Sequence, residues 1–150
     1  MKINDFKDMH CAIADVFGAI GDKWAILILR DLFFGKTKYS ELSKSSNITH
    51  ATLSSRLKHL ENEGIIIKQL YQKSPSRYEY HLTEKGKDLA LLLVAASQIG
   101  QKWGRDVGSI FPYHLENKHT GNAVILNLID EISGENIMIE DLIPKLTTHI

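Results

Sequence analysis

The sequence predicts a mainly helical fold with one small β-hairpin, an α+β arrangement. Three observations predict it. Apolar residues recur at helical spacing up to residue 62, the pattern then changes to that of strands, and a long stretch with helical spacing follows. At 150 residues, 43% hydrophobic and 24% charged, the chain has the size of one domain with a real core.

Two helices are expected before residue 36. Apolar residues recur from Ile13 to Ile20, and Asp22 can cap the helix that follows. The stretch KWAILILRDLFFG then places four apolar residues on one broad face, and Gly35 ends it. The four are Trp24, Ile28, Leu29 and Leu32.

A shorter helix and a third helix come next. In KYSELSKSS, Leu42 is the inward-facing residue, and Asn47 ends the helix. Thr49 is a good N-cap for a helix from His50 to about Asn62, which Gly64 ends.

The third helix has two different faces. Leu53, Leu57 and Leu60 cluster within about 60° on a helical wheel and face a core. Small polar and basic residues lie on the other side. They are Ala51, Ser55, Lys58 and His59, with Ser54 at the edge. This side is either an ordinary solvated face or a surface that approaches base edges and phosphates.

A β-hairpin is predicted after Gly64. The stretch IIIKQLY is apolar and β-branched, QKSPS is rich in turn residues, and RYEYHLT alternates strictly. In the last stretch, Tyr78, Tyr80 and Leu82 share one side, and Arg77, Glu79 and His81 share the other. The tip of this hairpin is basic.

A long helix begins at Glu84 and carries an apolar stripe at three- and four-residue steps. The stripe consists of Leu89, Leu92, Leu93, Ala96, Ile99 and Trp103. Because this stripe is too long for a small domain to cover by itself, we expect it to form the interface of a homodimer.

Three helices followed by a two-stranded hairpin is the order of a winged helix-turn-helix. In that fold the third helix enters the major groove of DNA, and the hairpin lies over an adjacent groove or backbone. The expected partner is double-stranded DNA. The candidate contact residues are Lys38, Ser40, Thr49, His50, Thr52, Ser54, Ser55, Arg56, Lys58, His59, Lys73, Ser74, Ser76 and Arg77.

The distribution of charge agrees with this prediction, although the net charge is zero. Residues 36–87 carry ten Lys or Arg and five Asp or Glu, net +5. Residues 1–35 have a net charge of −1 and residues 88–150 a net charge of −4. Positive charge is therefore confined to the predicted DNA-binding segment.

Several motifs resemble the HxlR-type branch of bacterial winged-helix transcriptional regulators, relatives of the MarR group. They are Cys11 ahead of IGDKW and ILILRDLFFG, then YSEL, TLSSRLKHLENEGII and SRYEYHLTEKG, with a Trp near the end of the long helix. The resemblance implies a homodimer that reads a pseudo-palindrome with one recognition helix per half-site. It also implies that the long helix and the N-terminal helix build the dimer interface. Ala51 stands where family members often carry a basic residue.

The chain continues beyond the point at which family members usually end. We expect residues 1–107 to form the DNA-binding and dimerisation domain, and residues 108–150 to be a helical extension packed on it. NAVILNLIDEISG and IMIEDLIPKLTT have the apolar spacing of two short amphipathic helices with acidic outer faces. The extension either enlarges the core or the dimer interface, or provides a ligand or partner site.

Cys11 is the only cysteine, which fits a reducing cytoplasm. The resemblance implies a cysteine that senses oxidants or electrophiles, and a thiolate near a helix N-terminus is chemically suited to this. The effector would then be an oxidant or a small molecule. The alternative is a buried cysteine that acts as a small hydrophobic residue.

The sequence contains no motif that indicates metal binding, catalysis, membrane insertion or secretion. The histidines form no recognisable metal-ligand set, no catalytic motif is present, and we expect no cofactor. The longest apolar runs are too short to span a membrane, and the N-terminus lacks the pattern of a secretory signal. The remaining alternative is a winged-helix protein-interaction module without sequence-specific DNA binding.

Overall fold

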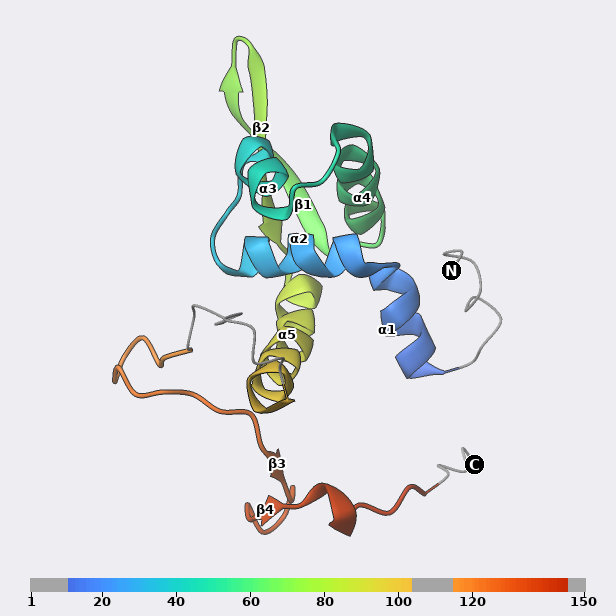
Figure 1. The fold of residues 1–150 in the computed structure, drawn as a ribbon, viewed down its shortest axis with the longest axis vertical. Coiled ribbons are helices and arrows are strands. Elements are labelled where there is room, and N and C mark those ends of the chain that lie inside the picture. Colours follow the sequence, from blue (N-terminus) through green and yellow to red (C-terminus); the bar gives the residue numbers. More distant parts are fainter. Residues whose placement is uncertain (1–10, 104–114, 146–150) are drawn as a thin grey trace. The chain divides into compact units, whose positions relative to one another are not determined.

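The computed structural model describes residues 11–103 and 115–145. Up to Trp103, the helices and strands follow the order expected from the sequence (Figure 1). They are α1 Ala12–Ile20, α2 Lys23–Phe33, α3 Tyr39–Ser46, α4 His50–Asn62, β1 Ile66–Lys73, β2 Ser76–Leu82 and α5 Glu84–Trp103.

The core forms around α2, which packs against α3, α4 and β2. Leu53, Leu57 and Leu60 of α4 are all buried, as the helical wheel predicts. Of the four apolar residues expected on the inner face of α2, Ile28, Leu29 and Leu32 are buried, whereas Trp24 is half-buried.

Asp22 fixes the start of α2. One of its carboxylate oxygens, Oδ1, accepts hydrogen bonds from the backbone N–H groups of Trp24 and Ala25 at 3.0 and 3.1 Å. These bonds satisfy two of the N–H groups that have no partner within the helix. The sequence prediction of Asp22 as a cap is confirmed.

A buried carboxylate joins α2 to α3. Asp31 is 1% exposed, and its Oδ1 accepts a hydrogen bond from Arg30 Nη2 at 2.8 Å. Its Oδ2 accepts another from the hydroxyl of Ser46 at the end of α3, at 3.1 Å. The charge is therefore compensated, as a buried carboxylate requires.

β1 and β2 form an antiparallel hairpin, which we call the wing. The pairing is regular except that Tyr71 has no partner: Leu70 pairs with Tyr78 and Gln72 with Arg77. One extra residue on one strand is a β-bulge, which turns side chains away from the regular alternation. The chain before α3 joins the other edge of β2, because the N–H of Tyr80 donates to the carbonyl oxygen of Thr37 at 2.9 Å.

The chain divides into two compact units, one ending at Leu93 and the other beginning at Val94, so that the division falls within α5. The expected boundary between residues 107 and 108 lies outside the described residues. No helix in the described parts of the chain is long and apolar enough to cross a membrane.

The prediction of two helices in the C-terminal extension is wrong for its described residues, 115–145. The short strands β3 (Leu128–Ile129) and β4 (Asn136–Ile137) pair there, and a 3₁₀ helix spans Ile139–Asp141. Asp130 shapes the turn between the strands, where its carboxylate accepts hydrogen bonds from the N–H groups of Ser133 and Ile132. These bonds stabilise the charged form and lower the pKa of Asp130.

Candidate nucleic-acid interface

α4 separates a buried apolar face from an exposed polar one. Ser54, Ser55 and Lys58 are exposed, and they alternate along the helix with the buried leucines. His50 and Thr49 are exposed at the N-terminal end, where the Thr49 hydroxyl caps the helix by accepting from Thr52 N–H at 3.3 Å. The exposed side is free to contact a partner because no side chain on it contributes to the core.

Tyr39 connects the start of α3 to the start of α4. Its hydroxyl donates to the backbone carbonyl of His50 at 3.1 Å and lies 3.0 Å from Ser54 Oγ. The Tyr39 and His50 rings stack with centroids 5.7 Å apart and planes 7° apart. The N-terminal end of α4 is therefore held rigidly against α3, with Asn47 in a left-handed conformation (φ 48°) in the intervening turn. Sequence reasoning did not identify Tyr39.

The wing and the start of α3 carry the remaining predicted contact residues, and all are exposed. They are Lys38, Ser40, Lys73, Ser74, Ser76 and Arg77. No carboxylate among the described residues forms an ion pair with Lys58, Lys73 or Arg77. Cations without an acidic partner are suited to phosphate groups.

Two predicted contact residues on α4 are engaged inside the protein instead. Arg56 Nε contacts Asp22 Oδ2, so its guanidinium faces the start of α2. His59 Nε2 lies 2.9 Å from the carbonyl oxygen of Ala19 at the end of α1. Thr52 is half-buried beside the Thr49 cap. Arg56 and His59 anchor α4 to the helices behind it and therefore leave the candidate contact set.

A hollow of about 380 Å³ lies between α4 and β1. It brings Ser54 and Lys58 of α4 together with Lys68 of β1. Lys68 was not predicted; its ammonium group lies 4.0 Å from the centroid of the Tyr78 ring. The sequence could have identified Lys68, because it occupies an alternating position in a strand that follows the predicted recognition helix.

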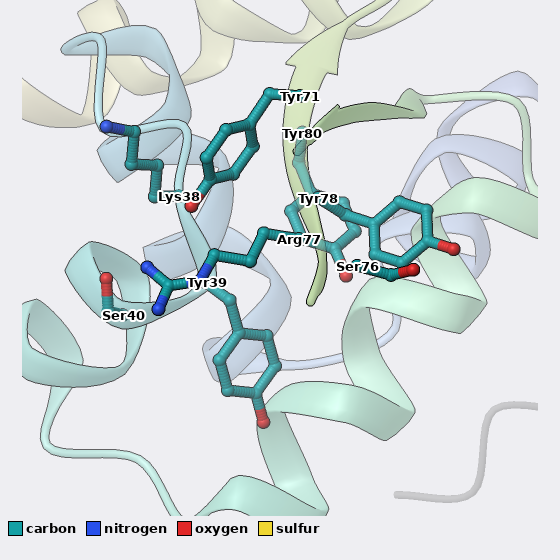
Figure 2. Close-up of a pocket in the computed structure, with 8 residues that line it drawn as sticks. All are labelled: Lys38, Tyr39, Ser40, Tyr71, Ser76, Arg77, Tyr78 and Tyr80. Atoms are coloured by element: carbon teal, nitrogen blue, oxygen red, sulfur yellow. The ribbon is translucent and has the colours of Figure 1, made fainter. Parts of the chain in front are cut away.

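A second hollow, of about 460 Å³, lies between α3 and the wing (Figure 2). Four tyrosines, two cations and two serines line it: Lys38, Tyr39, Ser40, Tyr71, Ser76, Arg77, Tyr78 and Tyr80. We call it the tyrosine cleft. Tyr80 is 7% exposed, and burial, together with the nearby Glu61 carboxylate, raises the pKa of its hydroxyl.

The members of the predicted dimerisation stripe of α5 differ in their exposure. Leu89 and Leu93 are half-buried and pack against the core of their own chain. The other four members are exposed: Leu92, Ala96, Ile99 and Trp103. Leu91, which sequence reasoning left out, is 58% exposed.

Cys11 is exposed and occupies the N-cap position of α1. The alternative prediction of a buried, packed cysteine is therefore wrong. Among the described residues, no group of three or more His, Cys, Asp or Glu side chains is placed to hold a metal ion.

The profile of the family described as HxlR-like helix-turn-helix matches residues 19–107. The chain belongs to this family. It is also 35% identical, over 84% of its length and 79% of the relative's, to an uncharacterised HTH-type transcriptional regulator of Mycobacterium tuberculosis. This HxlR-like chain is therefore a member of a family of helix-turn-helix transcriptional regulators, as its motifs predict.

Two solved structures agree with the fold of this HxlR-like protein. One, the crystal structure of PA1607, has a TM-score of 0.80 and 30% identity, with 95% of this chain and 98% of that chain covered. The other is the redox regulator HypR in its oxidised form. Its TM-score is 0.59 at 30% identity, and the match covers 65% of this chain and 100% of that one.

Proposed function

We propose that this chain is a sequence-specific regulator of transcription that binds a pseudo-palindromic DNA operator as a homodimer in the cytoplasm. The observation that carries the proposal is the combination of the exposed polar face of α4 with the unpaired cations of the wing. In a winged helix-turn-helix, α4 enters the major groove, and the wing reaches the neighbouring backbone. Small hydroxyls on α4 allow its backbone to come close to base edges.

The contact residues fall into two groups. Ser54, Ser55 and Lys58 face the groove and read bases, while Lys73 and Arg77 hold phosphates. The hollow between α4 and β1 adds Lys68 as a further cation beside this surface.

The test begins with selection of bound duplexes from a random pool, followed by affinity measurements at several salt concentrations. Lys73→Ala and Arg77→Ala should each weaken binding and reduce the salt slope by about one unit per lost phosphate contact. Lys58→Ala should weaken binding and relax the preferred sequence. Lys44→Ala, an exposed lysine in the last turn of α3, is the matched control. If the affinity for the duplex changed neither with salt concentration nor with any of the three substitutions, the result would instead support a protein-interaction module.

The exposed part of the α5 stripe supports dimerisation as part of this proposal. Apolar side chains that remain exposed on a folded chain commonly mark an interface. A dimer places two copies of α4 on one duplex, which a pseudo-palindromic operator requires.

We also propose that Cys11 makes binding responsive to oxidants or electrophiles. Its exposure at the start of α1 allows a reagent to reach it, and the similar protein HypR is described as a redox regulator. Two Cys11 thiols, one per subunit, can lose two hydrogens to diamide and form one disulfide. Diamide should change operator affinity in the wild type and not in Cys11→Ser; an equal response in both proteins would refute the proposal.

A further inference from the structure

The hydroxyl of Tyr39 contacts several groups at the N-terminal end of α4. It lies 3.1 Å from the backbone carbonyl oxygen of His50 and 3.0 Å from Ser54 Oγ. It also lies 3.3 Å from Nδ1 of the His50 ring, which stacks on the Tyr39 ring. Figure 2 shows the Tyr39 ring directed away from Tyr71, and its hydroxyl reaches α4. A phenol carries a single hydrogen, so it can donate to only one of these groups.

The His50 carbonyl decides where that hydrogen points. A carbonyl oxygen can only accept, so its bond with Tyr39 exists only if the phenol O–H is directed at it. If the phenol donated to Ser54 instead, two oxygens without a hydrogen between them would face each other at 3.1 Å. The Ser54 hydroxyl therefore donates to the phenol oxygen, and so does Nδ1–H of His50.

This direction restricts what Ser54 can offer to a partner. A serine hydroxyl has one hydrogen and two lone pairs that accept. With its hydrogen turned toward Tyr39, Ser54 presents only lone pairs on the exposed side of α4. The hydroxyl of the neighbouring Ser55 has no hydrogen-bond partner among the described residues, so it remains free to donate or to accept.

We propose that Tyr39 makes Ser54 an acceptor and thereby determines which bases α4 selects, namely adenine or cytosine at the point that Ser54 faces. These two bases expose an amino group in the major groove, whereas guanine and thymine expose a carbonyl oxygen there. The lone pairs of Ser54 accept from either amino group and repel either carbonyl oxygen. The inference rests on the proposed function, in which α4 enters the major groove. Tyr39 acts only through Ser54 and is a positioning residue.

The first experiment uses crystals of the free protein in deuterated solvent, without DNA. Neutron diffraction locates the deuterium on each hydroxyl. The deuterium of Tyr39 should point at the His50 carbonyl oxygen, and that of Ser54 should point at the Tyr39 oxygen. A Ser54 deuterium directed to solvent, or a Tyr39 deuterium directed at Ser54, would overturn the proposal.

The second experiment measures the base preference on the duplex selected from a random pool. The base pair that faces Ser54 is the one at which Ser54→Ala changes the preference. The four possible pairs should divide there into A·T and C·G against T·A and G·C, because the members of each set carry the amino group on the same strand. Affinity should differ about tenfold between the sets, since an acceptor that faces an acceptor is left unsatisfied. Any other division, or a Ser54→Ala protein with every preference unchanged, would overturn the proposal.

Deletion of single groups from the preferred pair identifies the atom that Ser54 contacts. Purine in place of adenine, or 2-pyrimidinone in place of cytosine, lacks the amino group. Wild-type binding should weaken by about tenfold more than that of Ser54→Ala, and the comparison cancels the lost Watson–Crick bond. Deletion of the carbonyl oxygen from the opposite base should affect both proteins equally. A difference between the proteins that follows the carbonyl oxygen would make Ser54 a donor and overturn the proposal.

Tyr39→Phe keeps the aromatic ring and removes only the hydroxyl. Because the Ser54 hydrogen is then free, affinity for the disfavoured pairs should rise to within about twofold of the preferred ones. Preferences at the positions read by Ser55 and Lys58 should stay unchanged, and Tyr71→Phe, which removes a phenol from the wing, is the control. An equal loss of affinity for all sequences would show a merely structural role for Tyr39 and would overturn the proposal, as would an unchanged preference.

These outcomes separate the base preference from the proposed function. A selected duplex whose pairs do not divide between the two sets would overturn the preference and leave the proposed function standing. A protein that selects no duplex would contradict both.

Discussion

Asp22 uses its two carboxylate oxygens for two different helices. Oδ1 caps α2 through the N–H groups of Trp24 and Ala25, and Oδ2 contacts Arg56 of α4. The side chains of Asp22 and Arg56 are 26% and 23% exposed, so solvent screens their attraction only in part. A single carboxylate thus joins the start of α2 to α4.

This arrangement predicts that Arg56 contributes to stability and little to DNA affinity. Asp22→Ala loses both the cap and the ion pair and should lower the free energy of unfolding by about 2 kcal/mol. Arg56→Ala loses only the pair and should cost about 1 kcal/mol. Urea unfolding checks both values, and a double mutant should cost less than the sum.

Duplex affinity of Arg56→Ala provides the second readout. It should stay within about twofold of the wild type under conditions in which both are folded. A large loss of affinity with unchanged stability would return Arg56 to the contact set.

For the candidate contact residues of α4, the sequence predicts which side chains point to solvent only where the buried leucine stripe alone determines this. Ser55 and Lys58 lie opposite the leucine stripe and Ser54 lies at the edge of that side, and their exposure follows from helical periodicity. The helical wheel places Arg56 beside the leucine stripe and His59 on the outward side, but a long side chain turns toward whichever partner is in reach. Their partners, Asp22 and the Ala19 carbonyl, are distant in sequence, so no local pattern identifies them.

At the level of elements, the start of α5 is locked against the start of β1. Thr83 donates its hydroxyl to the carbonyl of Gly64 at 2.7 Å and accepts from the N–H of Gly86 at 3.2 Å. Gly86 is buried, and a Cβ there would overlap the carbonyl oxygen of Ile65. The absence of a side chain at Gly86 is what allows helix and strand to meet.

The two glycines of α5 should therefore respond oppositely to substitution. Gly86→Ala should lower the free energy of unfolding by about 1–3 kcal/mol, because backbone must move to make room. Gly100→Ala meets no atom within 4 Å and should raise it by about 0.5–1 kcal/mol, since alanine favours helix. Thermal or urea unfolding of both variants checks the prediction, which equal effects would contradict.

The exposed part of the α5 stripe makes a prediction about assembly. Ile99 is 62% exposed, and Ile99→Asp should convert the dimer to a folded monomer because a charge in an apolar interface has no partner. Gln101→Asp changes an exposed polar residue on the same helix and should leave the dimer intact. Sedimentation at micromolar concentration, with circular dichroism to verify folding, distinguishes them; a monomeric wild type would refute the interface.

The extension was mispredicted because its apolar residues fit more than one period. Val124, Ile125 and Leu126 are consecutive, so the segment contains both helical and alternating spacings. Periodicity alone cannot separate helix from strand in such a run, whereas β-branched content and the glycine at 134 favour a strand and turn. By contrast, α2 and α4 carry both a clear period and a cap residue, and both were predicted closely.

At the scale of the whole molecule, the proposed homodimer requires two copies of α4 to reach one face of the duplex. The centres of the operator half-sites should then lie about one helical turn, roughly 34 Å, or a multiple of it apart. Insertion of about 5 base pairs between the half-sites places them on opposite faces and should reduce affinity to the non-specific level, about 10³-fold or more. The same insertion outside the half-sites is the control, and equal affinity for both duplexes would exclude a rigid dimer.

The division of α4 into two faces has a consequence for how such regulators diverge. Leu53, Leu57 and Leu60 hold the helix in place, while Ser55 and Lys58 make no contribution to the core. Exchanges among the outward residues are therefore nearly neutral for folding, since surface substitutions usually change stability by less than about 0.5 kcal/mol. A duplicated gene can acquire a new operator through a few such exchanges while its product stays folded at every intermediate step.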